Sequence, residues 1–231
     1  MLHRLLERLR RSRFDTVSLA TSTDASDDVL IDLAEEAGVS THRGSLNDVL
    51  SRVIGAARAA EADVIVEITG DCPLVDPAIV DAVLARYLAG GYDYVANVLD
   101  ELTFPIGFDV QVFSVDLLED VSRLTQDPAD RENVTSFIYR NPERYRLLNV
   151  RAPPALDRPR YRLCVDYPQD FHLIEQIYQT LYPVDAAFSA EAVVLLLDSR
   201  PDLATSNTTM PNAFEWPSSG GRADQEMPAI A

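Results

Sequence analysis

The stretch DVIVEIT (residues 63–69) runs directly into GDCP (residues 70–73). A short apolar run of this kind, bounded by glycine and proline, is typical of a strand buried within a sheet. The glycine and the proline mark the turn at which such a strand stops. The sequence therefore predicts a buried strand that delivers Asp71 to its carboxyl end.

Helices and strands alternate on the N-terminal side of this run. Apolar residues recur at helical spacing in residues 1–9, 26–37, 45–57 and 76–87, and the strands predicted among them lie at 16–22 and around residue 39. Strict alternation favours a parallel sheet with helices on both faces, which places the chain in the α/β class.

The second half of the chain is less regular. Strands are predicted at 92–98, 108–113, 145–150 and 161–166, and helices from residues 114, 130 and 168 and over 190–200. We expect one domain over residues 1–200. From residue 201 onward, Pro, Ser, Gly, Asn and Thr dominate without periodicity, so residues 201–231 are predicted to be a disordered tail.

The charge balance excludes several classes of partner. With 20 basic and 37 acidic residues among 231, the formal net charge is −17. Such a surface repels nucleic acids and anionic membranes. Every basic residue is an arginine, which excludes a P-loop lysine or a Schiff-base lysine within these residues. Without a signal-peptide pattern or an apolar run long enough to span a membrane, the expected location is the cytoplasm.

Neither cysteines nor histidines show the spacing of a metal site or a catalytic triad. Cys72 and Cys164 are far apart in sequence and lack a CxxC motif, which favours two reduced thiols. The three histidines are scattered. We expect structural or surface roles for all of them.

Two aspartates follow predicted strands and precede proline-containing turns. Asp71 ends the first run and Asp166 ends the strand predicted at 161–166. Ligands of open α/β sheets bind at the carboxyl ends of the strands, and two carboxylates from different strands can hold one Mg²⁺ beside a substrate phosphate. The alternative is that each aspartate only caps its turn. The pattern alone does not separate these readings.

Other polar residues are weaker candidates for contacts with a ligand. Asp109 follows a Pro-Ile-Gly-Phe turn and could face a substrate or fix that turn. Arg43 could bind an anionic ligand, as could Arg131 with Asn133 at a predicted helix start. Ordinary surface and helix-terminal polarity explains these residues equally well.

The ordered set of short motifs resembles one family. The run ITGDCPLVD (68–76) is similar to a signature of the cytidylyltransferases of the type that acts in spore coat polysaccharide biosynthesis, relatives of the acylneuraminate and 3-deoxy-manno-octulosonate cytidylyltransferases. The likeness continues in collinear order through these segments: 20–22, 43–45, 48–50, 92–97, 107–110, 131–135, 139–142, 165–166 and 168–171. It covers the chain from Met1 to about residue 181.

The resemblance implies a fold and a reaction. The fold is a Rossmann-like nucleotide-diphospho-sugar transferase fold, with a mixed, mainly parallel sheet and helices on both faces. The reaction joins CTP and a sugar or sugar acid to give a CMP-sugar and pyrophosphate, with Mg²⁺ as cofactor and usually a homodimer. By motif, the residues implied are Asp71 and Asp166 for catalysis and metal binding, Ala20, Thr21, Ser22, Arg43 and Gly70 for the nucleotide, and Asp109, Arg131 and Asn133 for the sugar substrate.

The sequence departs from the family pattern at its start and at single positions. The family begins with a strand and a Gln-Ala-Arg-Met-Gly-Ser-x-Arg-Leu-Pro-Gly-Lys loop that holds the triphosphate, and these 231 residues do not contain it. Glu67 also replaces a basic residue, and Asn133 replaces a histidine. We therefore expect a first strand to be missing, a gap in the middle of the sheet, and weak CTP binding by these residues alone. The alternative function is that of a non-catalytic binding protein that keeps the fold.

Overall fold

The structure of the protein is a computed structural model that describes residues 1–99 and 101–210. Helices and strands alternate through the first half, as the sequence predicts. In chain order the elements are α1 (Leu2–Leu9), β1 (Ser18–Ser22), η1 (Ala25–Asp27), α2 (Asp28–Glu36), β2 (Ser40–Gly44), α3 (Val49–Ala59), β3 (Val64–Glu67), α4 (Pro77–Leu88), β4 (Tyr94–Ala96), β5 (Gln111–Ser114), α5 (Val115–Leu124), α6 (Pro128–Glu132), α7 (Ser136–Tyr139), β6 (Leu147–Asn149), α8 (Pro168–Leu181), α9 (Ala190–Ser199) and α10 (Pro201–Ala204).

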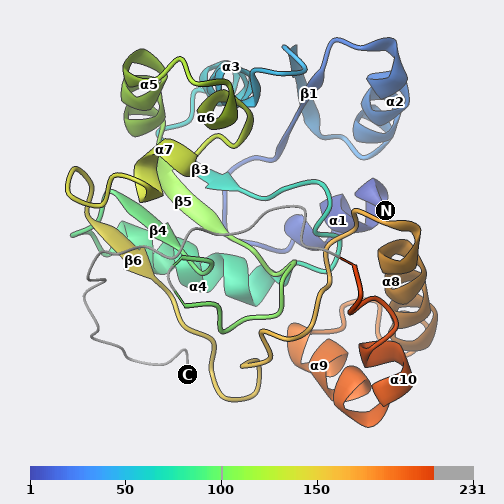
Figure 1. Ribbon diagram of the computed structural model, residues 1–231. Coiled ribbons are helices and arrows are strands. Elements are labelled where there is room, and N and C mark those ends of the chain that lie inside the picture. The colour runs from blue at the N-terminus through green and yellow to red at the C-terminus, as the bar shows by residue number, and fades with distance from the viewer. Residues whose placement is uncertain (100, 211–231) are drawn as a thin grey trace.

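The strands form two separate sheets (Figure 1). Strands β1 and β2 make a parallel pair, with Thr21 opposite Arg43 in the register. The other sheet has the order β3-β5-β4-β6. In it β5 runs antiparallel to both β3 and β4, whereas β4 and β6 are parallel. The architecture is therefore mixed α/β, as expected.

Helices cover both faces of the four-stranded sheet because its strands alternate their side chains between two cores. Val95 and Val112 join the larger core, which includes apolar residues of α1, α4, α8 and α9. Their neighbours Tyr94 and Phe113 point to the opposite face and pack with α3, α5 and α7. This alternation fixes the register, because a slip of one residue would exchange the two faces.

A gap separates the two sheets. Among the described residues, β1 pairs only with β2, and β3 pairs only with β5. A cavity of about 590 Å³ lies between β1 and β3 and is lined by residues of both strands and of α1 and α3. The expected gap in the middle of the sheet is confirmed.

Some elements differ from the sequence prediction. Residues 161–166 form no strand, and their only ladder contact is an isolated bridge between Ile106 and Arg162. The helix predicted from residue 130 is two short helices, α6 and α7, with Val134 between them at a φ of 48°. A β-branched residue rarely adopts this left-handed conformation, so the helical pattern could not continue through it.

The boundary predicted at residue 200 is too early. Residues 201–204 form α10, and Asn207 beyond it is buried with 1% of its surface exposed. Its amide donates hydrogen bonds to the backbone oxygen of Arg162 at 3.0 Å and to Oδ1 of Asp170 at 2.7 Å. The disorder predicted for residues 201–210 is therefore wrong, and the rest of the predicted tail, residues 211–231, lies outside the described residues.

Within the described part of the chain, no helix has both the length and the apolar character needed to cross a membrane.

Replacing Asn207 tests whether residues 201–210 stabilise the domain. Asn207→Ala removes two buried hydrogen bonds and leaves Asp170 with one donor fewer, so we expect a loss of about 1–3 kcal/mol in the free energy of unfolding. Urea denaturation measures this loss. The control is Thr208→Ala, which removes only an exposed hydroxyl contact. Equal stability of the two variants would contradict the anchoring role.

Candidate active site

Two segments that are distant in sequence, one with Asp71 and the other with Cys164 and Asp166, meet at one acidic cluster. A carboxylate oxygen of Asp71, the sulfur of Cys164 and a carboxylate oxygen of Asp166 all lie within 4.8 Å of one another. Asp71 is half-buried, Cys164 is buried and Asp166 is exposed. The structure thus brings together the two aspartates that the sequence predicts as metal ligands, and adds a thiol to them.

Backbone contacts hold these segments against one another. The N–H of Val165 donates to the carbonyl oxygen of Asp71 at 2.9 Å, which fixes the segment after Cys164 to the loop after β3. Gly107 has a φ of 101°, and a Cβ atom there would lie 2.6 Å from the nitrogen of Cys164. Only glycine permits both this conformation and this approach. The loop that carries Asp109 can therefore pack directly on the segment that carries Cys164.

A buried network orients Asp166. Asp170, which is fully buried at the start of α8, accepts hydrogen bonds from the backbone N–H groups of Asp166 and Tyr167, both at 3.0 Å. Arg162 donates to Asp170 at 3.1 Å through Nε and also forms an ion pair with Asp166. Burial alone would raise the pKa of Asp170, but the hydrogen bonds from Arg162 and Asn207 outweigh it and lower that pKa.

Burial changes the proton affinity of the groups behind the cluster. Desolvation raises the pKa of Asp109 to about 7, against a hydrogen bond from the N–H of Gly107, and the negative charge of Asp71 adds to the rise. Desolvation likewise raises the pKa values of the Cys72 and Cys164 thiols well above their usual range. Both cysteines are free and buried, so near neutral pH they are protonated thiols.

The donor set fits a divalent cation. Two carboxylates from different segments, with one of them exposed, are the oxygen ligands that Mg²⁺ takes while keeping water or phosphate oxygens in its remaining positions. Adjacent carboxylates without a cation repel each other, and Arg162 offsets the charge of Asp166. The thiol of Cys164 donates a hydrogen bond to Asp166 at 3.5 Å. Its sulfur is a softer metal ligand than the carboxylate oxygens of the two aspartates.

Some of the residues predicted to bind the nucleotide line a cavity, and others bond to neighbouring side chains. Ala20, Thr21 and Gly70 line the cavity between β1 and β3. Thr21 and Ser22 both donate their hydroxyls to Asp27, at 2.7 and 2.6 Å, and these bonds lower the pKa of Asp27 to about 2.

Arg43 lies on β2 beside this end of β1. It donates to the backbone oxygen of Ser22 at 2.8 Å and pairs with Asp28 at 2.7 Å. These two contacts hold its guanidinium group beside the end of β1 and the start of α2.

Two of the predicted sugar-side residues lie on or beside α6. Arg131 makes a two-pronged ion pair with Asp48, which caps α3, and donates to the hydroxyl of Ser122 at 2.9 Å. The amide of Asn133 donates to the backbone oxygen of Ala129 at 2.8 Å. Both side chains are therefore engaged in contacts within the protein, whereas Asp109 lies near Asp71 and Cys72.

Sequence reasoning missed three residues of this region. Cys164 lacks the spacing of a metal ligand, Arg162 reads as an ordinary strand residue, and Asp170 reads only as part of a helix start. The one available signal was the four-residue spacing of Arg162, Asp166 and Asp170, which brings them together where the helix begins. The contact of Cys164 with Asp71 depends on the fold alone.

Comparison with known proteins gives a consistent result. Residues 1–191 match a family described as Cytidylyltransferase. The spore coat polysaccharide biosynthesis protein SpsF of Bacillus subtilis is 33% identical over 211 residues, which cover 89% of this chain and 86% of that protein.

Two solved structures extend the comparison. A cytidylyltransferase from Leptospira borgpetersenii superimposes with a TM-score of 0.84 at 29% identity, covering 91% of this chain and 87% of that one. A CMP:2-keto-3-deoxy-manno-octonic acid synthetase, solved in complex with CTP, has a TM-score of 0.57 at 15% identity, with coverage of 78% and 88%. The second likeness concerns the fold alone.

The pKa of Asp109 predicts how stability changes with pH. An ordinary aspartate, as in the unfolded chain, has a pKa of 3.8, so between pH 4 and about 7 the folded protein holds a proton that the unfolded chain has released. Raising the pH through this window should therefore lower the free energy of unfolding. Because Asp109 is partly exposed, we expect a loss of about 1–3 kcal/mol.

The measurement is chemical denaturation at several pH values in the presence of EDTA. Asp109→Asn keeps the acceptor for the N–H of Gly107 but cannot ionise, so its stability should fall less over the same window. Asp157→Asn, a change at an exposed aspartate, is the control. Parallel pH curves for wild type and Asp109→Asn would contradict the prediction.

Proposed function

We propose, from the premise that this chain belongs to the cytidylyltransferase family, that it serves the transfer of a cytidylyl group from CTP to a sugar or sugar acid. In this reaction a hydroxyl oxygen of the sugar forms a bond to the α-phosphorus of CTP, the bond to pyrophosphate breaks, and the hydroxyl proton is released. The observation that carries the proposal is the meeting of Asp71, Cys164 and Asp166 at one exposed cluster.

Asp71 and Asp166 would hold Mg²⁺ in this reaction. When bound there, Mg²⁺ neutralises charge on the phosphates of the nucleotide and orients them. The protein's own contribution is positional: Asp170 and Arg162 fix the backbone and the carboxylate of Asp166, and the Val165–Asp71 hydrogen bond fixes the other ligand. The carboxylates of Asp71 and Asp166 are therefore held in position before a substrate arrives.

The nucleotide would lie toward β1 and the sugar toward Asp109. Ala20, Thr21 and Gly70 share one cavity, which opens beside the loop that carries Asp71. Asp109 stands behind Asp71 with a pKa near 7, so it can exchange a proton close to neutral pH. The product would serve polysaccharide synthesis, the process that the name of the Bacillus subtilis relative states for that protein.

A second candidate function is non-catalytic binding of a sugar or nucleotide on the same fold. One observation favours it: Asp166 already has a cationic partner in Arg162. An ion pair with an arginine satisfies a carboxylate without any metal. Metal binding and turnover therefore have to be measured separately.

Metal binding is tested on the two aspartates. We expect wild type to bind Mn²⁺, the paramagnetic substitute for Mg²⁺, and Asp71→Asn and Asp166→Asn each to lose at least about tenfold in affinity, because each removes one charged ligand. Electron paramagnetic resonance measures the free Mn²⁺. Asp157→Asn should bind as wild type does. Equal affinity of all four proteins would exclude a metal site at these aspartates.

Turnover is tested by release of pyrophosphate from CTP in the presence of Mg²⁺ and a panel of sugars and sugar acids. Asp166→Asn should remove most of the metal-dependent release while circular dichroism shows an intact fold. Metal binding without release under any condition would favour the non-catalytic alternative. Release that survives in both aspartate variants would contradict the assignment of these residues.

A further inference from the structure

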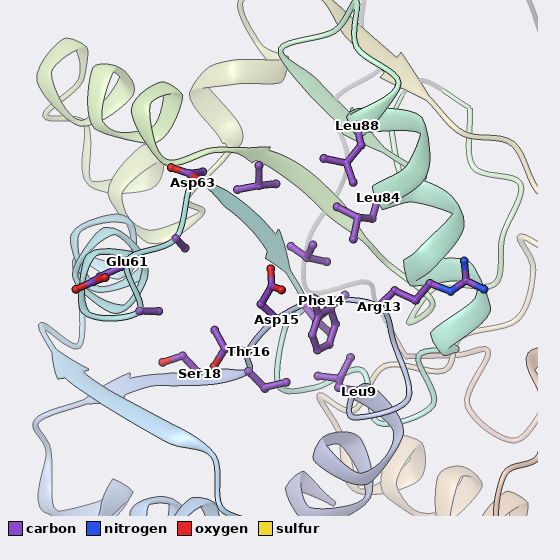
Figure 2. A pocket seen from close by; sticks show the side chains of 16 residues that line it. Leu9, Arg13, Phe14, Asp15, Thr16, Ser18, Glu61, Asp63, Leu84 and Leu88 are labelled. Carbon is purple, nitrogen blue, oxygen red and sulfur yellow. The ribbon is translucent and has the colours of Figure 1, made fainter.

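The acidic cluster at Asp71 differs from other groups of acids in the molecule because it contains a thiol. Three acids also line a cavity of about 410 Å³ beside the start of β3, namely Asp15, Glu61 and Asp63. Figure 2 shows these three carboxylates apart from one another, each on its own segment. Within residues 1–99 and 101–210, the three metal-ligating side chains that do converge are those of Asp71, Cys164 and Asp166.

The sulfur of Cys164 faces this cluster although the residue is buried. Cys164 is 5% exposed, yet its Sγ lies 3.5 Å from Oδ2 of Asp166 and within 4.8 Å of a carboxylate oxygen of Asp71. A buried cysteine ordinarily behaves as a small apolar residue. Two carboxylates are poor neighbours for such a residue. The surroundings of this sulfur are therefore those of a ligand rather than those of a core side chain.

The separation between sulfur and oxygen matches one edge of a tetrahedral Zn²⁺ site. Bonds of about 2.3 Å to sulfur and about 2.0 Å to oxygen, at the tetrahedral angle, place the two ligand atoms about 3.5 Å apart. The distance between Sγ of Cys164 and Oδ2 of Asp166 is 3.5 Å. The same distance suits the thiol hydrogen bond of the metal-free protein. A cation can therefore replace the proton between these two atoms without moving either of them.

The backbone on both sides of Cys164 is fixed. The N–H of Leu163 donates to the carbonyl oxygen of Ile106 at 2.7 Å, and the N–H of Val165 donates to the carbonyl oxygen of Asp71 at 2.9 Å. The second of these bonds joins the two segments that supply the cluster. Cys164 is thus set beside Asp71 by main-chain contacts, as a preorganised ligand requires.

We propose that Cys164 is a third ligand of the metal held by Asp71 and Asp166, and that its sulfur makes the site bind Zn²⁺ in preference to Mg²⁺. Thiolate is a soft ligand that suits Zn²⁺, whereas Mg²⁺ takes oxygen ligands. As the metal–sulfur bond forms, the thiol proton passes to the solvent. With three ligands from the protein, the fourth position is left for water or a phosphate oxygen on the exposed side, at Asp166.

The consequence for catalysis rests on the proposed function. Mg²⁺ serves that reaction with several waters and phosphate oxygens in its octahedral shell, whereas a tetrahedral Zn²⁺ with three protein ligands keeps one open position. Zn²⁺ would therefore displace Mg²⁺ and inhibit release of pyrophosphate from CTP. Cys164→Ser should relieve this inhibition, because it removes the ligand that favours Zn²⁺.

The test of sulfur ligation uses the full chain and Cd²⁺, a substitute for Zn²⁺ that gives an ultraviolet charge-transfer band when a thiolate binds it. In anaerobic buffer without added thiols, we expect one equivalent of Cd²⁺ to produce this band in wild type. Cys164→Ser should lack the band, and Cys72→Ser should keep it. Cys72 is the matched control because it is the other cysteine of the chain and is also free and buried.

Affinity gives a second readout. Competition with a chromogenic chelator measures Zn²⁺ binding, and Cys164→Ser should weaken it at least about tenfold, since even groups that only support a metal ligand contribute that much. Electron paramagnetic resonance measures Mn²⁺ binding, which should change little in the same variant, because Mn²⁺ prefers the carboxylate oxygens. Retained Mn²⁺ binding also shows that Cys164→Ser is folded.

Two results would overturn the proposal. A charge-transfer band that is absent from wild type, or present in Cys164→Ser, excludes Cys164 as a ligand. Equal Zn²⁺ affinity of wild type and Cys164→Ser reduces its thiol to a hydrogen-bond donor. Either failure is distinct from failure of the proposed function, because Mn²⁺ binding by the aspartates and release of pyrophosphate are measured without Cd²⁺ or Zn²⁺.

Discussion

The site rests on one buried ion pair, between Arg162 and Asp170. Asp170 is fully buried and Arg162 is 6% exposed, so neither charge has water to solvate it. Removing one partner of such a pair leaves an unpaired buried charge, which costs about 3–5 kcal/mol. Asp170 also accepts hydrogen bonds from the backbone N–H groups of Asp166 and Tyr167 and from the amide of Asn207. These bonds offset the free-energy cost of burying its charge.

This pair connects elements that are otherwise separate. Through Asp170 it fixes the start of α8, through Asn207 it holds the segment after α10, and through Arg162 it sets the carboxylate of Asp166. The acidic cluster is therefore attached to the core rather than to a free loop. A cluster held in this way can present its carboxylates to a cation without reorganisation, which is how a preorganised site lowers a barrier.

The split sheet is the second constraint on the molecule. Helix α3 packs on β1 and β2 and also lines the cavity between β1 and β3. Their facing edges are nevertheless unpaired within the described chain. A continuous sheet would satisfy those backbone groups. Three of the predicted nucleotide residues, Ala20, Thr21 and Gly70, line the cavity between these edges.

Much of the architecture could be predicted from local signals. Asp76 with Pro77 predicts the start of α4, and Pro168 predicts the start of α8, because caps and N-terminal prolines act within a few residues. The buried run at 63–69 predicts β3, and the absence of a first strand predicts the gap beside it. The meeting of Asp71 and Asp166 was predicted from the rule that carboxyl ends of strands form sites, although residues 161–166 form no strand in the structure.

The sequence by itself determined the α/β class, the order of most elements and the acidic residues available to a site, because periodicity and capping depend on neighbours along the chain. Only the tertiary structure decided that β3 pairs antiparallel with β5, that Cys164 joins the two aspartates, and that Arg131 is held by Asp48. These contacts join residues far apart in sequence, and burial and close approach, as at Gly107, select them. No local pattern encodes such contacts, since they arise only when the whole core packs.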